Sequence, residues 1–283
     1  MGKLTGFVRL MRPVNCLMMG FAVIVGAILA GFQISTLHLI NIAFGFMTGF
    51  TLCGAAMAIN DYYDRAIDAI NEPQRPLPSG VVTSREVLLF VAFLSIAGFI
   101  FASIVSILCL LVAAVSLIIT VTYLTVGKRS GLPGNFLVSA CVAIPFVYGS
   151  VTAISTLRLN VILFALMAFL SNTGREITKG IVDVKGDNSE GIKTLAVHFG
   201  EQRAAIGAVL FYVSAIALTP VTWMLGLVSV WFIPFVLVTD VGLAVCSGIL
   251  LIDPTREKAR TIKKVVLLLF IFGLLAYLFG AIK

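Results

Sequence analysis

The sequence is poor in charged residues and in histidine. Only 12% of its 283 residues are Asp, Glu, Lys or Arg, whereas 60% are hydrophobic. An ordinary soluble domain has roughly 25% charged and 45 to 50% apolar residues, so this composition excludes that class. The two histidines, His38 and His198, lie near the ends of apolar runs on opposite sides of the expected membrane, and we expect them at the surface rather than as metal ligands.

Cysteine is scattered rather than patterned. The five cysteines lie singly in apolar runs, at positions 16, 53, 109, 141 and 246. No pair has the spacing of a metal site, so we expect core residues that say nothing about the redox compartment. The formal net charge of +7 would suit a nucleic-acid binder in a soluble protein, but membrane topology already accounts for it, and we expect no nucleic-acid partner.

Long apolar runs are what the sequence has in abundance. A membrane-spanning helix needs about 20 apolar residues. The sequence predicts nine such spans, near 10–31, 38–59, 86–105, 107–126, 134–154, 159–180, 203–225, 229–251 and 262–281. Short connections leave no room for a separate soluble domain. We therefore predict an all-α, polytopic membrane helix bundle that forms a single domain over residues 1–283.

The basic residues predict the orientation of this bundle in the cell membrane. All of them except Arg158 and Lys283 lie in the N-terminal segment or in the connections after spans two, four, six and eight. By the positive-inside rule, the N-terminus is expected in the cytoplasm and the C-terminus outside. Every acidic residue except Asp240 lies on the same cytoplasmic side, which that rule does not require, so this face is the expected working face.

An acidic stretch follows the second apolar run. If the helix continues through it, Asp61, Asp64 and Asp68 share one face with Asn60. Carboxylates packed this closely repel one another, so an ionised cluster needs cations nearby. The stretch is followed by a segment with three prolines, Asn71 to Gly80, which we expect to end the helix and form a cytoplasmic loop.

A second acidic stretch follows the sixth apolar run. On a helix, Glu176, Lys179, Asp183 and Asp187 form one polar stripe. Two carboxylate clusters on one side of a membrane bundle suit magnesium, which takes one or two carboxylates together with substrate phosphates and water. A diphosphate would bring both clusters together, with Arg75, Lys128 and Lys179 as further cations, and the apolar bundle offers a slot for a hydrocarbon tail.

At these residues the chain resembles the UbiA superfamily of intramembrane prenyltransferases. The superfamily has nine helices, an NDxxDxxxD motif after the second helix and a DxxxD motif after the sixth, as found here at 60–68 and 183–187. The resemblance extends to the segment 71–76, to 123–128, and to Glu176 with Lys179. At Gly180 many relatives carry a further Asp. Within the superfamily, the stretch 12–16 and the compact length are most similar to the archaeal enzymes that attach a second geranylgeranyl chain to a glycerol phosphate ether lipid.

The resemblance implies Mg²⁺-dependent transfer of a geranylgeranyl group from geranylgeranyl diphosphate to the free hydroxyl of geranylgeranylglyceryl phosphate, with no obligate protein partner. The expected metal ligands are Asn60, Asp61, Asp64, Asp68, Asp183 and Asp187. The expected catalytic residues are Asp64, Asp68, Tyr123, Lys128 and Asp183. The expected substrate-binding residues are Asn15, Arg75, Lys128, Asn135, Glu176 and Lys179.

Other readings stay open at this point. The motifs concern binding of the diphosphate and do not determine the acceptor. The acceptor could therefore instead be an aromatic compound such as 4-hydroxybenzoate, or haem. An acceptor phosphate would need extra cations, for which Arg9, Arg12 and Lys185 are candidates. A cation-coupled secondary transporter is the alternative of another class, although transporter sites lie near the bilayer midplane, where only Asp240 is expected. Asn15 is either a ligand or a polar contact between helices.

Overall fold

A computed structural model describes residues 2–31, 35–189 and 191–282, and this part of the chain consists of helices and connecting loops, without strands. The helices are α1 (Lys3–Met11), α2 (Pro13–Leu29), α3 (Thr36–Tyr63), α4 (Arg65–Asn71), α5 (Ser84–Val105), α6 (Ile107–Thr125), α7 (Leu132–Ile154), α8 (Leu159–Ser189), α9 (Leu195–Phe199), α10 (Glu201–Met224), α11 (Phe232–Ile252) and α12 (Arg256–Gly280), with a short 3₁₀ turn η1 (Gly127–Arg129).

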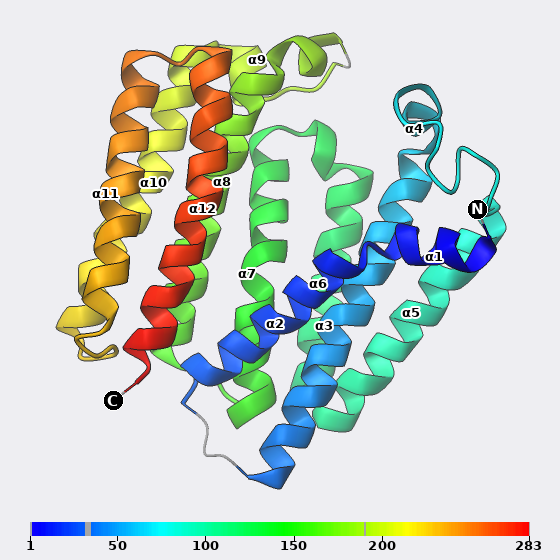
Figure 1. Cartoon of the computed structure of the whole chain (residues 1–283), viewed down its shortest axis with the longest axis horizontal. Coiled ribbons are helices and arrows are strands. Elements are labelled where there is room, and N and C mark those ends of the chain that lie inside the picture. The colour runs from blue at the N-terminus through cyan, green and yellow to red at the C-terminus, as the bar shows by residue number, and fades with distance from the viewer. Residues whose placement is uncertain (1, 32–34, 190, 283) are drawn as a thin grey trace. The chain divides into compact units, whose positions relative to one another are not determined.

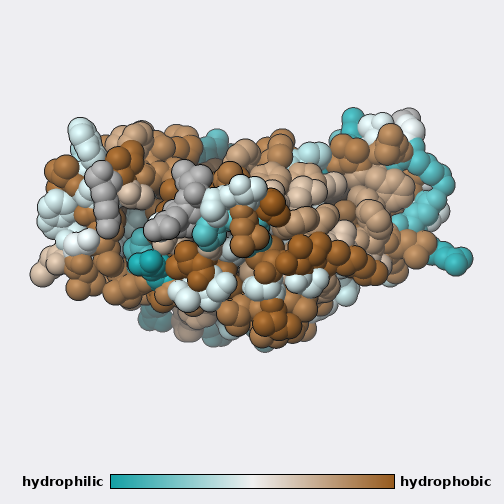
Figure 2. Space-filling model, turned by 90° about the horizontal axis from the view of Figure 1, so that it is seen from below, coloured by the Kyte–Doolittle hydropathy of each residue, from teal (hydrophilic) through white to brown (hydrophobic). Residues whose placement is uncertain are grey.

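Eight of the described helices are long and apolar enough to span a membrane: α3, α5, α6, α7, α8, α10, α11 and α12. A ninth span is reached if α1 and α2 count as one, but they bend by 43° at Arg12. The face seen in Figure 2 is mostly hydrophobic, as expected where lipid replaces water. The described chain is therefore a multi-pass membrane protein, and the prediction of an all-α membrane bundle is confirmed.

The predicted spans agree with the observed helices to within a few residues, and the largest differences lie at helix ends that carry charged residues. The predicted sixth span stops at 180, whereas α8 continues to Ser189 and carries the second acidic stretch on its last turns. The connection between α5 and α6 is a single residue, Ser106, since α5 ends at Val105 and α6 begins at Ile107. Lys283, expected on the outer side, lies outside the described residues.

The chain divides into two compact units. The first comprises Met1–Thr125 and Pro145–Leu157, and the second comprises Val126–Ile144 and Arg158–Lys283. The division falls inside α7, at a proline in the helix interior, Pro145. The prediction of a single domain over the whole chain stays a prediction.

In the first unit, α3 is the central element and packs against α2 and α5. Small residues let helices approach closely in membranes. Gly149 of α7 is an example, because a Cβ atom there would clash with the backbone oxygen of Val23 on α2. The short helix α1 is held by buried Leu10, which packs with Ala58, Val82 and Val87. Figure 1 shows α1 near the top of α5 and the loop that follows α4. This contact brings the N-terminal arginines to the end of α3.

In the second unit, α8 packs against α10 and α12, and α11 packs against α12 (Figure 1). Its core includes the fully buried Tyr212, whose hydroxyl lies 3.0 Å from the hydroxyl of Thr178 on α8. The guanidinium of Arg256 donates a 3.0 Å hydrogen bond to the backbone oxygen of Val182. These contacts fix the end of α8 that carries the second acidic stretch.

The deep carboxylate Asp240 belongs to this second unit. Thr219 of α10 donates a 2.6 Å hydrogen bond to its Oδ2 atom, whereas its Oδ1 atom is buried without a hydrogen-bond partner among the described residues. A charge at this depth costs about 2.5 to 3.5 kcal/mol on insertion scales. A single neutral hydroxyl is a contact between helices rather than an ion relay, so this pair gives no support to the transporter reading.

Candidate active site

The first acidic stretch is not one uninterrupted helix. α3 ends at Tyr63, Asp64 lies in a turn, and α4 begins at Arg65, so the expected continuous helix is wrong at one residue. The helical hydrogen bonds nevertheless continue, because Asp64 N donates to Asn60 O and Asp68 N donates to Asp64 O. The helical spacing is thus retained. Asp61 and Asp68 are buried, and the side-chain amide of Asn60 donates to Asp64 at 3.0 Å.

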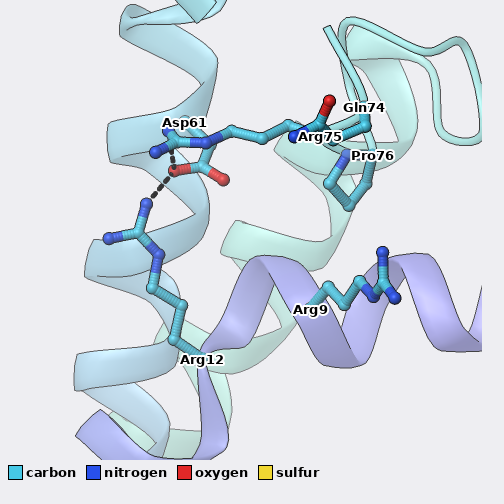
Figure 3. Close-up of a pocket in the computed structure, with 6 residues that line it drawn as sticks. All are labelled: Arg9, Arg12, Asp61, Gln74, Arg75 and Pro76. Atoms are coloured by element: carbon cyan, nitrogen blue, oxygen red, sulfur yellow. Dashed lines mark hydrogen bonds and ion pairs between the residues drawn. The ribbon is translucent and has the colours of Figure 1, made fainter. Parts of the chain in front are cut away.

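Two arginines neutralise the buried carboxylates (Figure 3). Arg12 Nη2 lies 2.6 Å from Asp61 Oδ1, and Arg75 Nη1 lies 3.7 Å from the same oxygen. Arg75 Nη1 also donates a 2.7 Å hydrogen bond to Asp68 Oδ2. The cations that the acidic cluster requires are therefore supplied in part by the protein itself. Arg75 was predicted near this cluster, but the pairing of Arg12 with Asp61 was not.

Local backbone conformation positions Arg12. It has φ 51° and ψ 71°, a left-handed conformation that only a few per cent of residues other than glycine adopt. The following Pro13 starts α2 and disfavours the right-handed helical conformation for the residue before it. The resulting bend separates α1 from α2 and directs the Arg12 side chain to α3.

The proline-rich loop positions Arg75. Its backbone folds back on itself through Arg75 N to Glu72 O and Val82 N to Pro76 O. It ends at Thr83, which forms a capping box with Glu86 at the start of α5. Partial burial lowers the pKa of Arg75, but the hydrogen bond and charge of Asp68 and the charge of Asp61 raise it further, so the net pKa shift is upward. Arg75 is a permanent cation.

The oxygen donors of this stretch are of the kind that Mg²⁺ prefers. Both arginines contact the Oδ1 atom of Asp61, and Oδ2 has no hydrogen-bond partner among residues 2–31, 35–189 and 191–282. Within those residues, however, no three His, Cys, Asp or Glu side chains lie close enough together to hold a metal ion. The donor chemistry fits magnesium, and the predicted metal ligands stay a prediction.

The second acidic stretch lies on α8, so its residues have the helical spacing on which the expected polar stripe depends. Glu176 is mostly buried, and its carboxylate lies 2.8 Å from Arg175 Nη1 and 3.6 Å from Lys179 Nζ. Sequence reasoning missed the pairing with Arg175, although the two residues are adjacent. Asp183 and Asp187 follow on the same helix and are both half-buried. A Cβ atom at Gly180 would come no closer than 3.5 Å to its nearest neighbour, Thr194, so no close contact requires glycine there.

The remaining predicted residues are distributed over both units. Asn15 is exposed on α2, where its amide lies 3.6 Å from the sulfur of Met57 on α3, a weak contact between helices. Tyr123 is half-buried near the end of α6 in the first unit. Lys128 lies in η1 and Asn135 in the first turn of α7, both in the second unit. The roles predicted for these residues stay predictions.

The buried acids, the paired arginines and the apolar helices together describe a membrane protein with a charged site at one end of a bundle. Comparison with known proteins identifies its class, since the model of the UbiA prenyltransferase family matches residues 19–274. The chain belongs to this family of prenyltransferase enzymes.

Particular relatives are found within this family. The digeranylgeranylglyceryl phosphate synthase of Natronomonas pharaonis is 37% identical over 92% of this chain and 92% of its own. The enzyme of the same name from Methanopyrus kandleri is 32% identical over 96% of this chain and 97% of its own.

Solved structures give the same picture. A structure reported for digeranylgeranylglyceryl phosphate synthase in membranes superposes with a TM-score of 0.90 at 29% identity and covers 99% of each chain. A UbiA homolog from Archaeoglobus fulgidus, bound to DMAPP and Mg²⁺, has a TM-score of 0.64 at 18% identity over 96% of this chain and 98% of its own. At that identity the second likeness concerns the fold alone.

Proposed function

We propose that this chain transfers a geranylgeranyl group from geranylgeranyl diphosphate to the free hydroxyl of geranylgeranylglyceryl phosphate, in the synthesis of archaeal ether membrane lipids. The observation that carries the proposal is similarity over more than nine-tenths of the chain to relatives named digeranylgeranylglyceryl phosphate synthase. The reaction breaks the bond between C1 of the prenyl group and the diphosphate oxygen. An ether bond then forms to the acceptor oxygen, and the hydroxyl loses its proton.

Magnesium is the cofactor of this proposal. Its ligands would be Asn60, Asp61, Asp64 and Asp68 from the first stretch and Asp183 and Asp187 from the second. When bound, it would neutralise the charge that develops on the departing diphosphate. The oxygen donors of Asp61 and Asp68 support this assignment, since both are buried in an arrangement that already holds cations.

The cationic side chains would bind the diphosphate itself. Arg75 can offer a two-pronged guanidinium, whereas Lys128 and Lys179 offer single ammonium charges. Glu176 holds Lys179 by an ion pair of 3.6 Å and so limits the positions of its ammonium group. Tyr123, Asn15 and Asn135 are assigned to the reacting end of the substrates, and the apolar helices to the prenyl tail.

The proposed arrangement places the charged site in the cytoplasm, with the N-terminus on that side and the C-terminus outside, in the cell membrane. The distribution of Lys and Arg supports this orientation. Labelling of single introduced cysteines with a membrane-impermeant reagent in intact cells tests it. Labelling near Arg158 without labelling near Arg65 is the expected pattern, and the reverse would contradict the orientation.

The function is tested by incubating the purified chain with Mg²⁺, labelled geranylgeranyl diphosphate and a panel of acceptors. We expect transfer to geranylgeranylglyceryl phosphate, none to 4-hydroxybenzoate or haem, and none when the metal is removed by a chelator. Transfer to 4-hydroxybenzoate alone would replace the proposal by its aromatic alternative. Cation-coupled uptake by vesicles, with no transfer to any acceptor, would replace it by the transporter.

A further inference from the structure

A charged pocket opens beside the first acidic stretch. It has a volume of about 180 Å³, several times the roughly 30 Å³ that one water molecule occupies in the liquid. Its lining comes from three segments that are distant in sequence: α1, the end of α3, and the loop after α4 (Figure 3). The lining residues are Arg9, Arg12, Asp61, Gln74, Arg75 and Pro76. The pocket therefore depends on the position of α1.

The pocket carries an excess of positive charge. Its lining residues include three arginines and one aspartate, a formal charge of +2, and Asp68, which pairs with Arg75 beside the pocket, lowers the local excess to +1. Arg12 and Arg75 both contact Asp61, which fixes their positions. Arg9 differs from them, because it is exposed and forms no ion pair or side-chain hydrogen bond among the described residues. Its guanidinium is available for an anion from outside.

The pocket lies where a ligand from the bilayer can reach it. Helix α1 is anchored by an ion pair between Lys3 and Glu86 and by packing of Phe7 against Phe90. Leu4 and Val8 remain 79% and 47% exposed on the same helix. A helix with basic residues and an exposed apolar face is typical of one that lies in the membrane interface.

The exposed apolar face continues along α2, next to the pocket. Val14, Met18 and Phe21 are exposed at about one-turn spacing on this helix. A chain of methylene groups lying on this face would have its polar head at the level of Arg9 and Arg12. A lipid-borne anion therefore fits the surroundings better than a small soluble one does.

We propose that this pocket binds the phosphate monoester of the acceptor and that Arg9 is a residue that determines specificity for a phosphorylated acceptor. The inference rests on the proposed function for the identity of that acceptor. A phosphate monoester carries about −1.5 to −2 charge at neutral pH, so a net-positive pocket attracts it more strongly than a carboxylate, which carries one charge. Arginine pairs with phosphate through two parallel hydrogen bonds. Arg75 is shared with the diphosphate, because it reaches Asp68 as well as Asp61.

The test is equilibrium binding without magnesium or prenyl diphosphate, so that no turnover occurs. The full chain in nanodiscs of zwitterionic lipid is given labelled geranylgeranylglyceryl phosphate or its dephosphorylated alcohol. We expect Arg9→Gln to weaken binding of the phosphate about tenfold to a hundredfold, as for a lost hydrogen bond between charged groups, and to leave the alcohol unaffected. Arg85→Gln is the matched control, because Arg85 is an exposed arginine of the same unit that does not line the pocket.

Three results would overturn the inference: equal affinity of the wild type for phosphate and alcohol, unchanged binding by Arg9→Gln, or an equal loss in Arg85→Gln. The inference would also be overturned if phosphatidylglycerol displaced the labelled phosphate as effectively as the unlabelled ligand does. The pocket would then be a general site for lipid headgroups. The Michaelis constant of Arg9→Gln for geranylgeranyl diphosphate should match the wild type, and a rise in that constant alone would assign the pocket to the donor. If no transfer occurs but Arg9-dependent binding persists, the proposed function fails and the phosphate site stands.

Discussion

The contact between Arg75 and Asp68 offers a quantitative test of how the proline-rich loop is held. Arg75 Nη1 lies 2.7 Å from Asp68 Oδ2, and the side chains are 33% and 9% exposed. Exposed ion pairs contribute about 0 to 1 kcal/mol, whereas breaking a fully buried pair costs about 3 to 5 kcal/mol. With one buried partner and one partly exposed partner, we expect an intermediate coupling of about 1 to 3 kcal/mol.

A double-mutant cycle of Arg75→Gln and Asp68→Asn measures this coupling. Thermal unfolding of the purified chain in detergent is the assay, and a domain of 150 to 250 residues shifts by about 2 to 4 °C per kcal/mol. Each single variant should melt several degrees lower than the wild type. The decrease in melting temperature of the double variant should be clearly smaller than the sum of the two single decreases. Strictly additive losses would show that the pair contributes nothing and would refute the reasoning.

Three further predictions follow from the site and from the packing. Asp64→Ala and Asp183→Ala should each abolish magnesium-dependent transfer while leaving the chain inserted and folded, because both are proposed metal ligands. Normal turnover in both would contradict the metal assignment. Lys128→Ala should raise the Michaelis constant for prenyl diphosphate, whereas an unchanged constant would indicate a membrane anchor only. Gly149→Ala should lower stability by about 1 to 3 kcal/mol in thermal unfolding, since a Cβ atom there meets the backbone of α2. Gly186→Ala is the control: its Cβ atom meets nothing within 4 Å and alanine favours the helix there, so stability should not fall. Equal melting of the two variants would contradict the close approach.

The helices were predictable because lipid requires long apolar runs. The residues of α5 and α6 are apolar almost throughout, and both predicted spans agree with the observed helices within two residues at each end. Four of the five cysteines are buried, as expected of core residues, and Cys141 is half-buried. Hydrophobicity could not predict where α8 ends, because its last turns carry the polar residues that normally indicate a loop.

The acidic residues of the candidate site could be predicted from the sequence, whereas the contacts of its arginines could be predicted only in part. Asp61 and Asp68 stood out by their helical spacing, which the structure retains across the turn at Asp64. The contact of Arg12 with Asp61 joins residues 49 positions apart and depends on a left-handed backbone at Arg12. No periodicity encodes such a contact. The available signal was Pro13, since the residue before a proline is biased away from the helical conformation.

The separate helix α1 was not predicted, because the search was for long apolar runs. The first predicted span begins at residue 10, and the segment before it was treated only as a basic flank. The pattern of Leu4, Phe7 and Leu10 with interspersed Lys3 and Arg9 is that of a short amphipathic helix, which a search for long apolar runs does not detect. This helix brings Arg9 to the pocket.

The most direct test of the proposed reaction is the mass of the product formed by the wild-type chain from geranylgeranyl diphosphate and geranylgeranylglyceryl phosphate in the presence of Mg²⁺. We expect an acceptor heavier by one geranylgeranyl unit, joined through an ether at the former free hydroxyl, with its phosphate retained. An unchanged acceptor mass, in a preparation that is inserted and folded, would contradict it.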